Sequence, residues 1–268
     1  MNSFLQKSFG AVYRRWIRSK LSSLQQQRFK LLFTVWGYRL ILSIKTISLK
    51  DRVRVILNSI AVDWNVQHGH WPGEIARVMA TIGERKARPG EVIVEAGCWK
   101  GGSTAKFSLI CEMLQYKLFV FDSFQGVEYI PGNSFSGQYA ADLDLVKKNV
   151  ASYGNIDVCE FVSGWFADTL AGNIFQHPVR VAYLDCDLAK GTHEVLQGLM
   201  PSYVDDGVIC SQDYHIGEVQ ALLDSDDTWQ NLGVSNVTIT DRFRNLVVFR
   251  FRKNILGEEN HIDSSSVL

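Results

Sequence analysis

From about residue 90 onward, short apolar runs alternate with stretches of helical length, and this alternation constrains the fold most strongly. The short runs are rich in β-branched and aromatic residues, which is typical of strands, and the stretches between them are long enough for crossover helices. Near-continuous apolar runs such as VIV and VAYL indicate parallel strands that are covered on both faces. We expect five parallel strands, at residues 91–97, 117–124, 157–164, 179–187 and 207–213.

The last two apolar runs, at 234–240 and 245–251, are separated only by the residues DRFR. This linker is too short for a crossover helix, so the two runs are predicted to form an antiparallel hairpin. The expected fold class is therefore α/β, with a doubly wound, mostly parallel seven-stranded sheet that ends in a hairpin. Helices are expected at 103–115, 140–153, 165–173, 189–203 and 216–224.

Charge is distributed unevenly along the chain, although the formal net charge is zero. Residues 1–55 hold twelve of the 28 Lys and Arg residues and a single acid, Asp51, whereas the remainder holds 16 basic and 27 acidic residues. We divide the chain into a basic, apolar N-terminal helical segment (1–70), the α/β domain that holds the expected sheet (71–253) and a polar tail (254–268). Nucleic-acid binding is not expected, because no binding signature accompanies the basic residues.

The apolar run at 31–49 allows three interpretations: helices of a cap that packs on the domain, a helix lying on a membrane surface, or a membrane span. Arg39 and Lys45 argue against a span, because each would cost about 2.5–3.5 kcal/mol at a bilayer centre. The basic flanks would attract anionic lipid in the second interpretation. We expect a cytoplasmic protein, with peripheral membrane contact through the basic N-terminus left open.

Five cysteines are widely spaced, contain no CxxC pair and are odd in number. This usage indicates a reducing compartment and argues against a zinc site. The cysteines are Cys98, Cys111, Cys159, Cys186 and Cys210.

Acidic residues stand at the ends of four expected strands: Glu95, Asp122, Asp185 with Asp187, and Asp213. Acids are poor strand residues, and ligands of open parallel sheets bind outside the carboxyl ends of the strands. Helix capping is the alternative explanation, but it accounts poorly for acids on four strands of one sheet edge. The acids therefore predict a ligand site at this edge.

The stretch EAGCWKGGST (95–104) leaves the first expected strand and reaches the following helix through three glycines. Gly97, Gly101 and Gly102 would let the backbone approach a ligand closely, in front of the helix N-terminus. Asp122, at the end of the next strand, can accept both hydroxyls of a ribose. The spacing is not G-x-G-x-x-G, which disfavours an NAD-dependent enzyme and favours S-adenosylmethionine, whose positive sulfur suits an acidic pocket.

Side chains two apart on a strand share a face, so Asp185 and Asp187 can converge with Asp213 of the neighbouring strand. Oxygen ligands with open coordination positions suit Mg²⁺, which could bind substrate oxygens and lower the pKa of the attacking hydroxyl. The alternative is that these acids only cap helices and shape the pocket.

Several motifs over about residues 88–225 carry a resemblance to a known family: VEAGCWKGGST, FVFDSFQGV, VKKNVASYG, FVSGWFADTL and LDCDLAKGTHEVLQGLMPSYVDDGVICSQDYH. In order and spacing they resemble the macrocin-type O-methyltransferases, which methylate sugar hydroxyls in macrolide biosynthesis. The resemblance implies a class I fold, S-adenosylmethionine as the cofactor and often Mg²⁺.

The resemblance also implies roles for individual residues. The residues implied for the cofactor are Glu95, Gly97 and Gly101 in the loop, Asp122 and Ser123 at the ribose, and Gly164, Trp165 and Phe166 at the adenine. The implied metal ligands are Asp185, Gln212 and Asp213, although the family usually has Asp-Asp where this chain has Gln212-Asp213. After Tyr214 this chain also departs from the family pattern, which makes His215 a second candidate base besides Asp185.

The acceptor is expected to be a hydroxyl of a sugar or glycosylated natural product, and a lipid-linked or cell-surface saccharide is as compatible as a macrolide. The long segment 125–139 offers Tyr129, Phe135 and Tyr139 for stacking on a sugar. Three alternatives remain: a non-catalytic cofactor-binding scaffold, a metal-independent methyltransferase and a hydroxylase-like relative. A homodimer is also expected.

Overall fold

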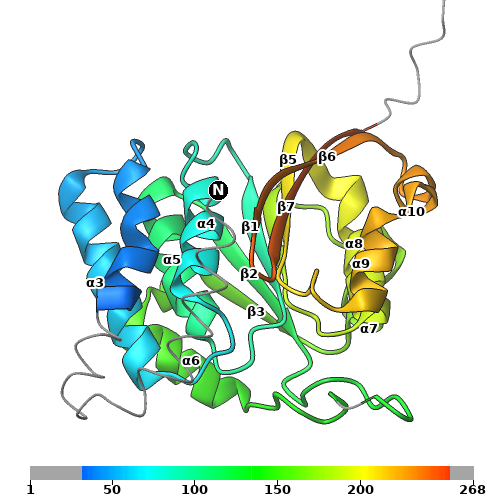
Figure 1. Cartoon of the computed structure of the whole chain (residues 1–268), viewed down its shortest axis with the longest axis horizontal. Helices are drawn as coiled ribbons and strands as arrows, with labels where there is room; N and C mark the ends of the chain where they lie inside the picture. The colour runs from blue at the N-terminus through cyan, green and yellow to red at the C-terminus, as the bar shows by residue number, and fades with distance from the viewer. Residues whose placement is uncertain (1–31, 134, 254–268) are drawn as a thin grey trace, which may run out of the picture.

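The computed structural model describes residues 32–133 and 135–253 of the chain. Residues 1–31, the first part of the expected N-terminal segment at 1–70, and the expected polar tail at 254–268 lie outside the described residues. The described part forms a central sheet with helices on both faces (Figure 1).

Seven strands form one sheet in the order β3-β2-β1-β4-β5-β7-β6. The pairs among β1 to β5 are parallel, whereas β7 is antiparallel to both β5 and β6. The predicted fold class, including the C-terminal hairpin, is therefore confirmed. In chain order the strands are β1 (Val92–Ala96), β2 (Lys117–Asp122), β3 (Cys159–Ser163), β4 (Val179–Leu184), β5 (Tyr203–Ser211), β6 (Val234–Phe243) and β7 (Leu246–Lys253).

Two helical layers enclose the sheet, with α3 to α6 on one side and α7 to α10 on the other (Figure 1). Each layer covers its own apolar cluster, as expected for strands that are buried on both faces. The α-helices are α3 (Leu49–Asn65), α4 (Pro72–Ile82), α5 (Gly102–Leu114), α6 (Leu143–Tyr153), α7 (Phe166–Thr169), α8 (Ala189–Leu199), α9 (Gly217–Asp224) and α10 (Asp226–Asn231). Short 3₁₀ helices are η2 (Tyr38–Ser43), η3 (Ile156–Val158), η4 (Ala171–Asn173) and η5 (Met200–Ser202).

The start of β5 differs from the prediction. The helix predicted over 189–203 ends at Leu199, and β5 begins at Tyr203 instead of 207. Two acids at the start of this strand, Asp205 and Asp206, have low strand propensity, so the sequence pattern did not indicate a strand there. Asp206 is nevertheless accommodated there, because the guanidinium of Arg85 donates to it at 3.0 Å.

Residues 38–66 pack on the domain as a helical cap. Tyr38, Val55 and Val62 have no exposed surface and belong to the same apolar cluster as Phe107 of α5. Among the described residues, no helix combines the length and the apolar content needed to cross a bilayer. The division of the chain at residue 70 stays a prediction.

A buried ionic group joins the cap to the domain. The ammonium of Lys106, on α5, lies 2.5 Å from the Asp63 carboxylate of α3, and neither side chain is more than 4% exposed. Asp63 also accepts from the Tyr38 hydroxyl at 2.9 Å and lies 3.0 Å from His68 Nε2. Buried charges persist only when they are paired and hydrogen-bonded, so this group fixes the cap against α5 in one position.

Candidate active site

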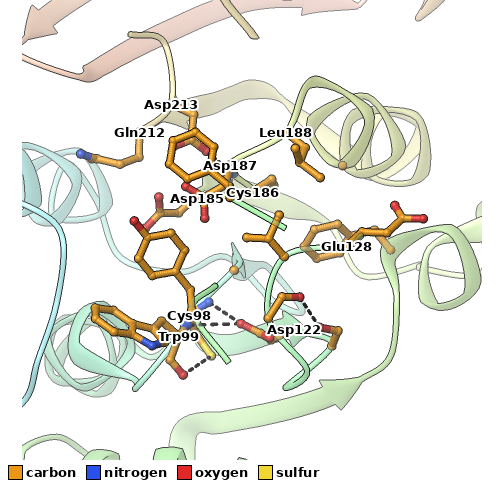
Figure 2. A pocket seen from close by; sticks show the side chains of 18 of the residues that line it. Cys98, Trp99, Asp122, Glu128, Asp185, Cys186, Asp187, Leu188, Gln212 and Asp213 are labelled. Carbon is orange, nitrogen blue, oxygen red and sulfur yellow. Dashed lines mark hydrogen bonds between the residues drawn. The ribbon is translucent and has the colours of Figure 1, made fainter. Parts of the chain in front are cut away.

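The candidate site lies where the strand order reverses, between β1 and β4. Open α/β sheets bind their ligands at such a switch point, outside the carboxyl ends of the strands. A cavity of about 230 Å³ opens there, and residues that follow β1, β2, β3, β4 and β5 line it (Figure 2). Five segments that are far apart in the sequence thus meet at one cavity.

On one side of the cavity, the Asp122 carboxylate holds the loop that follows β1. One carboxylate oxygen accepts from the backbone N–H groups of Cys98 at 2.8 Å and Trp99 at 3.3 Å (Figure 2). The other accepts from the N–H of Phe124 at 2.7 Å. Asp122 therefore couples the glycine loop to the end of β2, and its remaining acceptor capacity faces the cavity.

Most of the residues predicted to bind the cofactor line this cavity. They are Gly97, Asp122, Ser123, Gly164, Trp165 and Phe166. Gly101 does not: it is the N-cap of α5, with a left-handed φ of 76°, and a Cβ there would meet Val146 of α6 at 3.0 Å. It serves helix packing, and Glu95 also lies outside the cavity.

Glu95 is fully buried beneath the first turn of α5, where the hydroxyls of Ser103 and Thr104 are its polar neighbours. Burial raises the pKa of Glu95 to about 8, against the opposing effect of the hydroxyls of Ser103 and Thr104. The carboxyl is therefore protonated at neutral pH. The sequence prediction placed this residue in the cofactor loop, whereas the structure places it in the core.

Stability is expected to fall between about pH 4.5 and pH 8 because of Glu95. In this window the unfolded state has lost the proton that the folded state keeps, so the contribution present at low pH is lost as the pH rises. Replacing Glu95 with Gln removes a slope of at most about 1.4 kcal/mol per pH unit. Urea unfolding of both proteins at several pH values measures the difference. Parallel pH profiles for the two proteins would contradict the assignment.

On the opposite side of the cavity, three carboxylates converge at the ends of β4 and β5. Asp185, Asp187 and Asp213, here called the acid trio, each offer one oxygen, and these oxygens lie within 4.8 Å of one another. None of the three is the N-cap of a helix, since Leu188 and Ile216 precede α8 and α9. Capping therefore does not explain them.

Mutual repulsion and burial shape the titration of the acid trio. Burial, followed by the charges of Asp213 and Asp187, raises the pKa of Asp185 well above its usual value. Burial and Asp213 raise the pKa of Asp187 to about 7, and burial raises that of Asp213 to about 6. The Asp187 N–H donates to Asp213 at 2.8 Å and partly offsets this burial. The arrangement favours a proton, or a cation, among the three groups.

Three residues with left-handed backbone conformations line the cavity: Trp99 (φ 44°), Tyr139 (φ 61°) and Asp187 (φ 59°). Side chains other than glycine rarely adopt such angles, and they gather at functional sites. The Tyr139 ring packs edge-on against Trp99, with ring centres 5.2 Å apart. Burial and the charges of the acid trio raise the pKa of the Tyr139 phenol, so Tyr139 faces the three carboxylates.

The family model for macrocin-O-methyltransferases, TylF, matches residues 74–231, more than half of the chain. The chain belongs to this family. The match confirms the resemblance found in the sequence, and it contains every residue predicted for the site.

Individual relatives agree with the family match. An 8-demethyl-8-(2,3-dimethoxy-α-L-rhamnosyl)-tetracenomycin-C 4′-O-methyltransferase of Streptomyces olivaceus is 32% identical over 143 residues, which are 48% of this chain and 54% of that protein. The alignment with this curated relative thus spans about half of its length. The structure of the O-methyltransferase NovP is 20% identical, with a TM-score of 0.58, over 76% of this chain and 98% of that one.

A second solved structure shares the fold. It is that of the Podospora anserina methyltransferase PaMTH1 with S-adenosylhomocysteine bound, at 13% identity and a TM-score of 0.50. The likeness covers 75% of this chain and 87% of that one. Because both identities are low, the two solved structures support only the fold of this macrocin-O-methyltransferase family member, which is the class I methyltransferase fold.

Gln212 lies beside the acid trio, but its side chain is engaged elsewhere. Its amide donates to the buried Glu74 carboxylate at 3.0 Å, and its oxygen lies 3.3 Å from the Tyr183 hydroxyl. Figure 2 shows the amide pointing away from the three carboxylates. The ligand set implied by the family resemblance, Asp185, Gln212 and Asp213, therefore differs from the set that converges. Asp185, Asp187 and Asp213 converge, as the strand spacing predicted.

His215 lines the cavity from its exposed side and opposes the rise in the pKa of Asp187. It therefore lies beside the acid trio, where the sequence prediction placed a second candidate base. Its role as a base stays a prediction.

His70 also lines the cavity, and the sequence analysis did not find it. It is 8% exposed, its Nε2 has no hydrogen-bond partner among the described residues, and its ring stacks on His68 with centres 4.8 Å apart. Burial, Lys106 and His68 lower the pKa of His70 well below 6.5, so the ring is neutral at neutral pH. The short motif HGH before Pro72 was the available signal, but it lies far from the strand ends in the sequence.

Proposed function

We propose that this chain transfers a methyl group from S-adenosylmethionine to a hydroxyl of a sugar or of a glycosylated natural product. The observation that carries the proposal is the placement of the glycine loop with Asp122 and of the acid trio on opposite sides of one cavity. The first can hold the adenosine part of a cofactor and the second can face an acceptor. Family membership supports the same activity.

The proposed reaction is an in-line displacement. A lone pair of the acceptor oxygen forms the new O–CH₃ bond while the CH₃–S bond breaks, and its electron pair stays on sulfur to give S-adenosylhomocysteine. The cavity contributes chiefly by aligning oxygen, carbon and sulfur, because prior binding removes most of the entropy cost of bringing them together. The hydroxyl proton must leave to a group of the chain.

The acid trio supplies the candidate proton acceptors. Asp187, with its pKa of about 7, is ionised in a useful fraction near neutral pH, whereas burial and two neighbouring acids raise the pKa of Asp185 well above its usual value. Asp185 then orients the hydroxyl from the floor of the cavity. His215 stands at the exposed rim next to Asp187, where it can pass the proton to solvent.

The acid trio also fits a divalent metal ion in its chemistry. Its donors are three carboxylate oxygens within 4.8 Å, the ligand type that Mg²⁺ prefers. Such an ion would lower the pKa of a bound hydroxyl. Asp185, Asp187 and Asp213 would hold it, and Gln212 would keep its place in the hydrogen bonds to Glu74 and Tyr183.

A rhamnoside is the first acceptor to test, because the Streptomyces olivaceus relative is named for methylation of a rhamnosyl group. Phe135 and Tyr139 of the segment after β2 line the cavity and offer aromatic faces for a sugar ring. The Glu128 carboxylate of the same segment accepts from the Lys190 ammonium of α8 at 2.7 Å, and this ion pair connects the segment to the helix.

Replacing Asp122 with Ala is expected to weaken S-adenosylhomocysteine binding by about tenfold or more, because charge-assisted hydrogen bonds contribute roughly 1.5–3 kcal/mol. The variant loses both the tether of the Cys98 and Trp99 amides and the predicted ribose contact. Calorimetric titration of both proteins, with and without Mg²⁺, measures the effect. The exposed acid Asp144 of α6, replaced with Ala, is the matched control and should bind normally.

Two results would count against the proposal. Absence of S-adenosylhomocysteine binding in the wild-type protein would leave the glycine loop with a structural role only. Normal cofactor binding without turnover of any hydroxylated acceptor, including simple rhamnosides, would favour a non-catalytic scaffold.

A further inference from the structure

Helix α3 carries a row of exposed apolar side chains on the face that points away from the domain. Leu49, Val53, Leu57 and Trp64, here called the α3 face, are each 43–65% exposed. On a helix of 3.6 residues per turn these four positions fall within about 80° of one another. The half-buried Ile60 lies within this arc, and the half-buried Ile56 borders it. The row is thus one continuous apolar stripe.

Exposed apolar side chains are concentrated in this part of the molecule. Of the thirteen large apolar residues exposed in the described part of the chain, eight lie between residues 32 and 64. Four of these eight belong to the α3 face, and the other four precede α3: Leu32, Val35, Trp36 and Leu42. The others are scattered on separate elements, as is normal for a surface, whereas a gathered set indicates an interaction surface.

Basic residues accompany the α3 face. Lys50 and Arg54 follow its polar border on α3, and Arg39 and Lys45 are exposed on the preceding segment. Asp51 is the single acid among the first 55 residues, and the Ser48 hydroxyl already binds it at 2.6 Å. An apolar stripe with a basic border is typical of a helix that lies in the interface of an anionic membrane.

We propose that the α3 face docks this protein on the surface of a membrane that contains anionic lipid. The apolar side chains enter the boundary between headgroups and acyl chains, and the basic border meets the phosphate groups. No residue of α3 lines the cavity, so docking leaves the site open and does not depend on the proposed methyl transfer.

Charge argues against a second copy of the chain as the occupant. In a twofold dimer this patch of one copy faces the same patch of the other, so both sides of the contact would carry the basic border. Glu112 of α5 already pairs with Arg54 at 3.1 Å, and the Ser48 hydroxyl binds Asp51. Like charges facing each other disfavour self-association, whereas an anionic lipid surface complements them.

The test is cosedimentation of the full chain with phosphatidylcholine vesicles, with and without phosphatidylglycerol. We expect binding to the anionic vesicles only, and weaker binding as the salt concentration rises. The double variant Leu49→Gln and Leu57→Gln should bind at least about tenfold more weakly, because two apolar side chains no longer enter the lipid. Ile174→Gln with Ile239→Gln, two exposed apolar residues outside the α3 face, is the matched control and should bind like the wild type.

Equal vesicle binding by the wild type and the α3 variant, or no binding by the wild type, would overturn the proposal. Sedimentation velocity adds a third outcome: a wild-type dimer that the α3 variant converts to a monomer would assign the face to a second copy instead. S-adenosylhomocysteine titration of every variant shows that the fold and cofactor site are intact, so a failure of docking is distinguishable from a failure of the proposed activity.

Discussion

Replacement of Asp185 with Asn is expected to lower the turnover of methyl transfer by about a thousandfold while leaving S-adenosylhomocysteine affinity nearly unchanged. The substitution keeps the size of the side chain but replaces the carboxyl that orients the acceptor hydroxyl and shares the proton of the acid trio. Proton transfer by a positioned group contributes about 10²–10⁴ in rate, and loss of an oxygen ligand adds to this if a metal assists. Formation of S-adenosylhomocysteine from a rhamnoside measures the rate.

Asp205→Asn is the matched control, because Asp205 is an exposed acid on β5, away from the carboxyl ends of the strands. It should retain full activity. The same assay with a chelator, and with Mg²⁺ restored, tests the metal: activity that the chelator leaves unchanged would remove the metal from the proposal. Full turnover by Asp185→Asn would remove the acid trio from the chemistry altogether.

The sequence was sufficient to predict the sheet because its signals are local. The strand runs, the acids that follow them and the short linker DRFR can each be recognised within about ten residues. The start of β5 was missed for a related reason, since Asp205 and Asp206 contradict strand propensity locally. The Arg85 guanidinium that binds Asp206 comes from a segment 121 residues away. Tertiary contacts overrode the local preference at that point.

The cavity could be predicted in position but not in detail. That Asp185 and Asp213 converge follows from adjacent parallel strands. The orientation of Gln212 does not, because it depends on Glu74, a buried acid 138 residues earlier in the chain. Glu74 also accepts from the backbone N–H of Asn245 at 3.1 Å, which links α4, β5 and the β6–β7 turn. Such a network can be seen only after the chain has folded.

The strained residues of the cavity suggest how this geometry is held. Tyr139 keeps its left-handed backbone at the end of a segment closed by Val127 and Gln138, where the Val127 N–H donates to the Gln138 carbonyl at 2.9 Å. Asp187 keeps its left-handed backbone conformation while its N–H donates to the Asp213 carboxylate. Conformations of this kind cost about 1–3 kcal/mol each and persist only where surrounding contacts compensate, so these two hydrogen bonds help to hold the wall of the cavity.

Replacement of Gly97 with Ala is expected to lower the free energy of unfolding by about 3 kcal/mol or more. Gly97 has a left-handed φ of 85°, and a Cβ at this position would lie 2.0 Å from the carbonyl oxygen of Asp185. The clash can be relieved only if the ends of β1 and β4 separate, because the Asp185 N–H donates to the Ala96 carbonyl at 2.9 Å. Backbone strain adds about 1–2 kcal/mol. Urea unfolding measures the change.

Gly132→Ala separates the two causes. Gly132 has nearly the same φ, 83°, but no atom of the described part of the chain lies within 4 Å of a Cβ built there. This variant should lose only the strain contribution of about 1 kcal/mol, and it should bind S-adenosylhomocysteine like the wild type. Gly97→Ala should bind more weakly as well, because the strand ends that it forces apart carry the glycine loop and the acid trio. Equal destabilisation by the two substitutions would mean that the ends of β1 and β4 separate without a loss of stability. The close approach of Gly97 to Asp185 would then not stabilise the cavity.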